Sequence, residues 1–141
     1  MAAASERRAR VARVTSVFVG GCLGTACRSA ASNLIPSAGP LPTATLIVNV
    51  LASLLLGLLL EYLVRTGDDA GLRQLIRLGA GTGFCGSLST YGTFMVESEL
   101  LLASDTSAGL CYLAISAVLG LAAAFVGAGA ARKLAEGRGS R

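Results

Sequence analysis

The uncharged segment GFCGSLSTYGTF, residues 83–94, combines residues that loosen a helix with two kinds of aromatic ring. Gly, Ser and Thr form helices less readily than Leu or Ala, so we expect a helix to be interrupted here. An interruption bares carbonyl groups, which coordinate cations, and amides, which favour anions. Tyr91 and Phe94 lie three residues apart on one helix face, and the electropositive edges of such rings suit a small bare anion. The segment therefore indicates a site for an ion.

Asn49 places a strongly polar amide inside the apolar stretch LIVNVLASLLLG. Its two donors and one acceptor suit a dehydrated anion or, alternatively, an interhelical hydrogen bond. Ser53 and Gly57 follow Asn49 at four-residue steps, so the three lie on one helix face. This face is either a packing seam or one wall of a pore.

Three further polar residues lie within or at the ends of apolar stretches, where such side chains are costly and are candidates for function. Arg28 ends the first stretch, where it either snorkels to the membrane surface or makes an outer mouth electropositive. Glu97 lies three residues after Phe94 and shares its face. Ser116 either bonds back to its own helix or lines a pore.

The elements that must position these residues are membrane-spanning helices. Of the 141 residues, 53% are hydrophobic and 14% are charged, whereas ordinary soluble domains carry about 25% charged residues. A spanning helix needs roughly 17–25 mostly apolar residues. We therefore predict one all-α membrane domain, residues 1–141, with four transmembrane helices over about 11–34, 43–64, 72–103 and 108–131, the third of them broken in mid-membrane.

Several other classes of protein fit the sequence poorly. The chain has no histidine, which excludes a His-based proton relay or metal site, and no nucleophile–base pair is visible, so we do not expect an enzyme. The four cysteines have no zinc-site spacing, and we interpret them as small buried hydrophobic residues. A cleaved signal peptide is a competing interpretation of the basic start, but the glycines between residues 20 and 24 suit close helix packing better.

The basic residues predict how the helices are oriented. With four spans, both termini and the second connection lie on one side of the membrane. Of the 12 Lys and Arg residues, only Arg28 lies on the other side. The remaining eleven are Arg7, Arg8, Arg10, Arg13, Arg65, Arg73, Arg77, Arg132, Lys133, Arg138 and Arg141. Because basic loops stay inside, we expect both termini in the cytoplasm. Contact with anionic membrane lipid then accounts for the net charge of +4, and no nucleic-acid partner is needed.

Three motifs together resemble those of the Fluc/CrcB family of fluoride-specific ion channels. They are GGCLGTACR at residues 20–28, PTATLIVNVLASLLLG at 42–57 and GFCGSLSTYGTFMVE at 83–97, and the resemblance covers about residues 17–131. It implies passive fluoride efflux across the plasma (inner) membrane and an antiparallel dimer of inverted protomers that encloses two pores. It also implies a structural Na⁺ ion, not transported, at the dimer centre, held by the backbone carbonyls of Gly86 and Ser89.

The resemblance also implies a role for each candidate residue in the fluoride pathway. Asn49 matches an asparagine that contacts fluoride, and Phe94 matches the second ring of a paired-phenylalanine site. Ser116 matches a polar position on the last helix, and Glu97 the acidic end of the third. Tyr91 stands where phenylalanine is usual, Ser89 where threonine is usual, Gly92 where serine is usual, and Ser53 where glycine is common.

The distribution of charge also bears on the dimer and on the alternatives. A homodimer of inverted copies needs a sequence with little orientation bias, whereas eleven basic residues against one is a strong bias. We therefore predict pairing with a homologous, oppositely oriented subunit. One alternative, a small proton-coupled drug exporter, should carry a carboxylate within the first helix, and residues 14–27 have none. A non-conducting accessory membrane subunit is the other alternative, but it would not need the asparagine, the interruption and the aromatic rings together.

Overall fold

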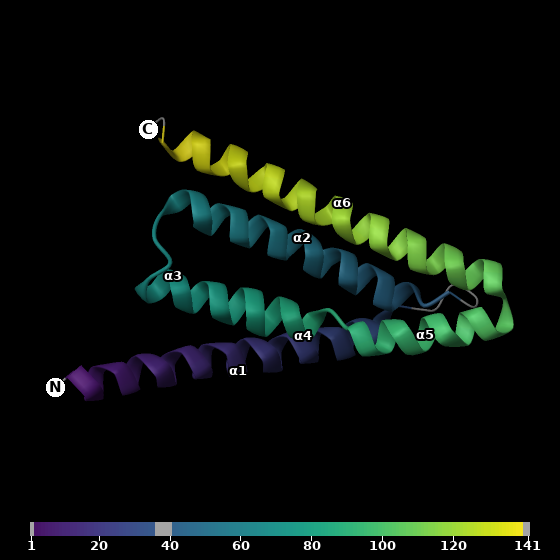
Figure 1. The fold of residues 1–141 in the computed structure, drawn as a ribbon, viewed down its shortest axis with the longest axis horizontal. Helices are drawn as coiled ribbons and strands as arrows, with labels where there is room; N and C mark the ends of the chain where they lie inside the picture. Colours follow the sequence, from purple (N-terminus) through teal and green to yellow (C-terminus); the bar gives the residue numbers. More distant parts are fainter. Residues whose placement is uncertain (1, 36–40, 140–141) are drawn as a thin grey trace.

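The computed structural model describes residues 2–35 and 41–139, nearly all of them helical (Figure 1). The described part of the chain forms four long helical passes, so the all-α prediction is confirmed. The first two are α1 (Ala2–Leu34) and α2 (Thr43–Thr66), and the last is α6 (Thr106–Gly139). The third pass consists of α3 (Gly71–Ile76), the π-helical segment η1 (Arg77–Cys85), α4 (Gly86–Leu88) and α5 (Tyr91–Ser104).

The first and last helices are longer than hydropathy indicates. Helix α1 begins at Ala2 rather than near residue 11, and α6 continues to Gly139 rather than ending near residue 131. The added ends are rich in Ala, Arg, Lys and Glu, which are good helix formers. Hydropathy locates the apolar part of a helix, and these polar ends continue it beyond that part.

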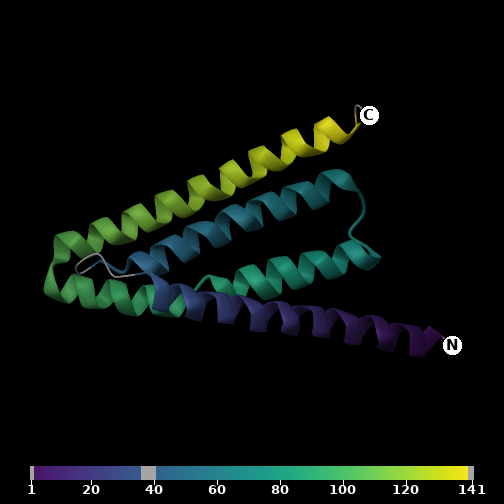
Figure 2. The ribbon, with the colours of Figure 1, turned by 180° about the vertical axis from the view of Figure 1, so that it is seen from behind.

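The four passes run side by side, and the termini share one end of the bundle. Figures 1 and 2 show both termini at the same end as the α2–α3 connection, with the α5–α6 turn at the opposite end. The most extensive contacts join α2 to α6, α1 to η1, and α5 to α6. This arrangement is the one that four antiparallel crossings of a bilayer require.

Glycines set the closest contacts between helices. A Cβ atom at Gly57 would overlap the carbonyl of Ala124 on α6, and a Cβ atom at Gly20 would overlap the carbonyl of Gly79 on η1. A Cβ at Gly120 would lie 3.6 Å from Ser53 Oγ. Small residues let backbones approach in this way in membrane bundles. The Ser53 and Gly57 part of the polar face of α2 is therefore a packing seam against α6.

The surface of the single chain is strongly apolar. Among the described residues, α2 and α6 are long and apolar enough to cross a membrane. Helix α1 contains Arg28 and many small polar residues, and the third pass is divided into shorter segments. Large side chains such as Phe18 and Phe125 are exposed. Our interpretation of the cysteines as buried was wrong for three of the four in the single chain, because only Cys85 is buried and Cys22, Cys27 and Cys111 lie on outward helix faces.

Candidate functional site

The third pass is interrupted at two residues. Helix α4 ends at Leu88, Ser89 (φ −69°, ψ 154°) and Thr90 (φ −143°, ψ 118°) are extended, and α5 begins at Tyr91. Thr90 caps the new helix, because its Oγ1 accepts a hydrogen bond of 3.2 Å from the amide of Thr93. The interruption thus ends one helix and creates the amino terminus of another, which carries partial positive charge.

Asn49 on α2 closes the gap that the interruption leaves. The amide of Thr90 would bond to the carbonyl of Gly86 in a continuous helix, but it donates instead to Asn49 Oδ1 at 2.8 Å. Asn49 Nδ2 in turn donates to the Thr90 carbonyl at 3.3 Å. The structure therefore assigns Asn49 an interhelical hydrogen-bonding role, with one of its two amide hydrogens left for another acceptor.

The Glu97 carboxylate is held by hydroxyl groups from two other helices. Thr45 Oγ1 on α2 donates to Glu97 Oε1 at 2.9 Å, and the Tyr112 hydroxyl on α6 lies 3.4 Å from Oε2. Thr45 and Tyr112 are both buried. Burial of a carboxylate is tolerated when hydrogen-bond donors surround it, so this triad ties α2, α5 and α6 together at a polar point.

The two predicted aromatic residues lie in different surroundings. The Phe94 ring is half-buried and packs on the Tyr112 ring, with centroids 5.5 Å apart and an interplanar angle of 42°. Tyr91 is 77% exposed in the single chain. Phe94 therefore belongs to the polar site around Glu97, whereas the Tyr91 ring lies on the surface of the single chain.

Ser116 lies one helical turn after Tyr112 on α6. Its Oγ atom is buried and close to the Tyr112 hydroxyl, but it makes no hydrogen bond of normal geometry to the described residues. Buried hydroxyl groups are usually paired. Ser116 consequently presents a hydroxyl that can bond to a ligand or to water.

Arg28 lines a cavity that borders the interruption at Thr90 and reaches Thr45, a partner of the Glu97 carboxylate. The cavity has a volume of about 360 Å³ and lies between α1, α2 and α5. It is lined by Thr25, Arg28, Ser29, Ser32, Asn33, Ala44, Thr45, Val48, Thr90 and Thr93. Thr45 also binds Glu97, and Thr90 also binds Asn49. Through these two threonines, the guanidinium, the amide and the carboxylate belong to one continuous polar region.

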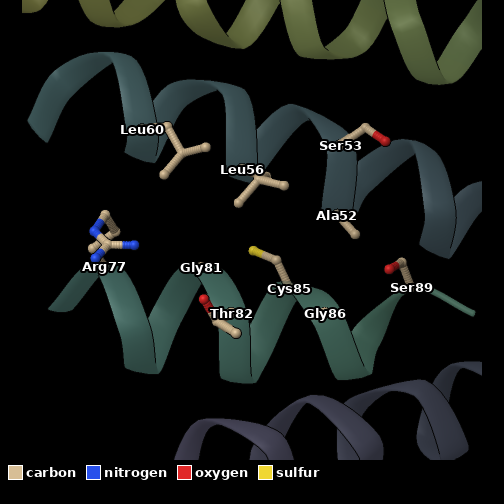
Figure 3. A pocket seen from close by; sticks show the side chains of 10 residues that line it. All are labelled: Ala52, Ser53, Leu56, Leu60, Arg77, Gly81, Thr82, Cys85, Gly86 and Ser89. Atoms are coloured by element: carbon tan, nitrogen blue, oxygen red, sulfur yellow. The ribbon is translucent and has the colours of Figure 1, made fainter. Parts of the chain in front are cut away.

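Gly86 and Ser89 lie on a different face, in a pocket of about 420 Å³ (Figure 3). Figure 3 shows Arg77 at one end of this pocket and the Ser53 and Ser89 hydroxyls at the other. Its full lining is Ala52, Ser53, Leu56, Leu60, Arg77, Gly81, Thr82, Cys85, Gly86 and Ser89. The polar groups nearest to the interruption are therefore hydroxyl and backbone oxygens.

The interruption leaves the backbone at Gly86 open. Because the Thr90 amide bonds to Asn49, it does not occupy the Gly86 carbonyl. A Cβ at Gly86 would meet nothing within 4 Å, so this backbone is open on the surface of the chain. Hard cations take roughly six oxygen ligands, and two carbonyls from one chain supply only part of such a set. Among the described residues no group of His, Cys, Asp or Glu could hold a metal.

Three residues of the site were not predicted to form contacts there: Thr45, Tyr112 and Thr90, the last of which was expected only as part of the interruption. Spacing held a signal for two of them, because Thr45 precedes Asn49 by four residues and Tyr112 precedes Ser116 by four residues. Residues four apart share a helix face. Extending each polar face by one turn would have found both hydroxyl groups that bind Glu97.

Comparisons with known proteins place the chain in one family. Residues 15–128 match the family model described as CrcB-like protein, Camphor Resistance (CrcB). A relative from Leifsonia xyli subsp. xyli, named fluoride-specific ion channel FluC 2, is 41% identical over 112 residues, which cover 79% of this chain and 77% of that protein. A FluC 2 protein of Bacillus subtilis is 37% identical over 121 residues (86% and 88%), and a FluC protein of Methanopyrus kandleri is 37% identical over 127 residues (89% and 93%).

Proposed function

This chain belongs to the CrcB family of membrane proteins, which are ion channels rather than enzymes, and we propose that it conducts fluoride. In this proposal the ion leaves the cell passively across the plasma membrane, and its loss lowers fluoride toxicity in the cytoplasm. The relatives' names and the resemblance of the three sequence motifs both support fluoride as the ion. The structure adds a physical reason, which lies in the polar region around the interrupted helix.

The observation that carries the proposal is the continuity between Arg28, Thr90 and Thr45. A small anion is strongly hydrated, so a pore has to replace its water with other hydrogen-bond donors. The Arg28 cavity offers a cation and several hydroxyl groups beside the amino terminus of α5, and such a terminus favours an anion. The unused amide hydrogen of Asn49 adds a donor at the same point.

The pathway continues toward α6 through the Glu97 triad. Thr45 and Tyr112 donate to Glu97, so their hydroxyls are already oriented and desolvated. A dehydrated fluoride ion needs these same donors, and Glu97 therefore competes with it for them. Ser116 offers the next hydroxyl, one turn further along α6. The edge of the Phe94 ring, fixed by Tyr112, borders this route.

A second chain completes the pathway in this proposal. Tyr91 is exposed in the single chain, and a ring can contribute to a pore only if another surface covers it. An antiparallel partner placed across the face that carries Gly86 and Ser89 would also enclose the bared backbone, which lipid cannot satisfy. The exposed apolar surface of the chain is consistent with such burial.

The proposed dimer has a structural Na⁺ ion between the two interruptions. The Gly86 and Ser89 carbonyls of each chain would hold it, and the open backbone at Gly86 fits this role. When bound, the ion neutralises the partial negative charge of carbonyl groups that meet at the centre. It is a fixed part of the assembly and is not transported.

The partner in the proposed dimer is a homologous subunit of opposite orientation. Both ends of the described chain and the α2–α3 connection lie at the same end of the fold, and in the sequence these three parts of the chain carry eleven of the 12 basic residues. The positive-inside rule then favours a single orientation with cytoplasmic termini. Expression of the chain alone and with a candidate second subunit tests this point, because strong fluoride transport by the chain alone would rule out a required heterodimer.

A growth assay tests the function in cells. Bacteria that lack their own fluoride exporter should regain growth in fluoride when they express this chain with its partner subunit. No rescue by any combination, with the proteins present in the membrane, would favour a non-conducting accessory subunit. Resistance to cationic drugs without resistance to fluoride would instead favour a small proton-coupled exporter.

A further inference from the structure

A long groove follows the seam between α1 and the α3–η1 part of the third pass. Its first part, about 680 Å³, begins at Arg7 and Arg8 and continues past Val11. Its second part, about 460 Å³, lies between Leu23 on α1 and Ile76 on α3. The two parts share Ser16, Val19 and Leu75, and neither contains a residue of the Gly86–Ser89 pocket or the Arg28 cavity. We call this surface the α1–α3 groove.

Close backbone contact makes the floor of the groove, and larger apolar side chains make its walls. A Cβ at Gly20 would overlap the Gly79 carbonyl, and a Cβ at Gly79 would overlap Ser16 Oγ. Leu23 and Leu72 stand exposed on either side. The Ser16 hydroxyl donates to the Leu75 carbonyl at 2.7 Å, so the polar groups of the floor satisfy each other. Away from its basic end, the groove therefore presents an apolar surface.

Arg7 and Arg8 have charges that nothing in the described protein neutralises. Several other basic side chains near this end have partners: Arg65 and Arg132 pair with Glu61, Arg77 pairs with Asp69, and Arg73 bonds to Leu63, Thr66 and Asp68. Within the described ranges, no ion pair or side-chain hydrogen bond joins Arg7 or Arg8 to another residue, including the neighbouring Glu6. The basic end of the groove is thus free to bind an anionic group.

The length and polarity of the groove match one class of ligand. From Arg8 to Leu23 a helix rises about 22 Å, and half of the hydrocarbon core is about 15 Å thick. The groove is therefore long enough to hold an acyl chain within one leaflet and the phosphate beyond the edge of the core. We propose that the α1–α3 groove binds an anionic diacyl phospholipid, with its phosphate at Arg7 and Arg8 and one acyl chain along the apolar walls. Basic pockets beside membrane helices bind anionic headgroups in this way. The inference rests on the chain being a membrane protein and not on which ion it conducts.

Native mass spectrometry of the full chain, purified in a neutral detergent and titrated with dioleoyl phosphatidylglycerol, tests the proposal. We expect one tightly bound phosphatidylglycerol per chain and much weaker binding of dioleoyl phosphatidylcholine. The Arg7→Gln/Arg8→Gln variant should bind phosphatidylglycerol about 30-fold more weakly, if each arginine contributes about 1 kcal/mol. Fluoride transport is not the readout, so this result is independent of the proposed channel function.

Two further variants separate a defined groove from general attraction of charge. Arg10→Gln/Arg13→Gln removes the same charge from the same helix but outside the groove, so it should retain most of the binding. Thr15→Phe keeps every charge and fills the groove at an exposed lining position, so it should weaken binding even if the arginine variants fail to insert. The proposal would be overturned if the two double arginine variants lost phosphatidylglycerol binding equally, or if Thr15→Phe bound this lipid as the natural protein does. Equal binding of phosphatidylglycerol and phosphatidylcholine by the natural protein would also overturn it.

Discussion

Asn49 and Thr90 exchange two hydrogen bonds, of 2.8 Å and 3.3 Å, across the gap between α2 and the interrupted third pass. The side-chain amide thereby replaces the backbone group that Thr90 would have met in a continuous helix. One residue of α2 thus holds the interruption in a fixed shape and keeps a donor beside the Arg28 cavity. The proposed transport pathway depends on this pairing, because the pairing sets where α5 begins.

Two substitutions at Asn49 should separate its structural role from its role toward the ion. Asn49→Ala leaves the Thr90 amide without a partner, so we expect a loss of about 1–3 kcal/mol in the free energy of unfolding. Asn49→Asp keeps the Oδ1 acceptor but adds negative charge, so assembly should persist while fluoride transport falls by at least about tenfold. Thermal unfolding in detergent and vesicle flux measure the two effects. If Asn49→Ala is as stable as the natural protein, then Asn49 does not stabilise the interruption at Thr90.

Phe94→Ile should slow fluoride transport while the protein still assembles. Isoleucine keeps an apolar side chain beside Tyr112 but lacks the electropositive ring edge. The matched control is Phe125→Ile on α6, where the ring is 70% exposed in the single chain and lies outside the polar region. If the two variants transport equally well in vesicles, the Phe94 ring has no part in the pathway.

Tyr112→Phe should reduce transport without reducing stability much. The substitution keeps the ring that packs on Phe94 and removes only the hydroxyl, whose bond to Glu97 is long at 3.4 Å. Thr45→Val removes the other donor to Glu97. Because both hydroxyls serve one carboxylate, the double variant should lose less than the sum of the two single losses. Additive effects on flux would show that Thr45 and Tyr112 do not act on the same step.

Gly57→Ala should destabilise the α2–α6 contact by about 1–3 kcal/mol, because the new methyl group would overlap the Ala124 carbonyl. Gly129→Ala on α6 is the matched control, since a Cβ there meets nothing within 4 Å. We expect that control to be neutral or to stabilise the helix by about 0.5–1 kcal/mol. Thermal unfolding of both purified variants measures this difference. Equal unfolding temperatures for Gly57→Ala and Gly129→Ala would contradict the close packing of α2 on α6 at Gly57.

Asp105 should make the stability of the α5–α6 turn depend on pH in acid. Its carboxylate accepts hydrogen bonds from the Ser107 hydroxyl at 2.6 Å and from the Ser107 and Ala108 amides. These bonds, the Ser107 hydroxyl first, lower the pKa of Asp105 from its ordinary value. A lowered pKa means that the stabilisation is complete above the ordinary pKa of about 4 and is lost as pH falls through the lower folded value.

The Asp105→Asn variant checks that assignment, because asparagine still caps the helix but does not titrate in this range. As the pH is lowered from about 5 to about 2, the unfolding temperature of the natural protein should decrease relative to that of the variant. If the unfolding temperatures of the two proteins change with pH in the same way over this range, Asp105 contributes nothing to the pH dependence.

Much of the fold follows from hydropathy and helix propensity. The expected range 43–64 falls within α2, and the Gly, Ser and Thr residues of 83–94 include the two extended residues, Ser89 and Thr90. The resemblance to the CrcB family, drawn from three short motifs, is confirmed by the match over residues 15–128. These features are local, so a single stretch of sequence contains the information that determines them.

The parts that could not be predicted depend on contacts between distant segments. Nothing local indicates that Asn49 meets Thr90, 41 positions later, or that Glu97 takes its partners from α2 and α6. The sequence places Tyr91 and Phe94 on one face, but only the packing of Tyr112 decides which ring is covered. The π-helical turns of η1 were also missed, because they arise where the glycine-rich segment fits against α1.

Fluoride release from vesicles is the measurement that tests the central claim most directly. The chain, alone and with its proposed partner subunit, would be reconstituted into vesicles loaded with potassium fluoride, and a fluoride-selective electrode would record efflux after a potassium ionophore is added. We predict rapid fluoride release by the natural protein, little release when chloride is the loaded ion, and a slow leak from Asn49→Asp. A fluoride pathway at the interrupted helix would be contradicted if Asn49→Asp released fluoride at the rate of the natural protein. It would also be contradicted if the correctly inserted natural protein released no fluoride, either alone or with its partner subunit.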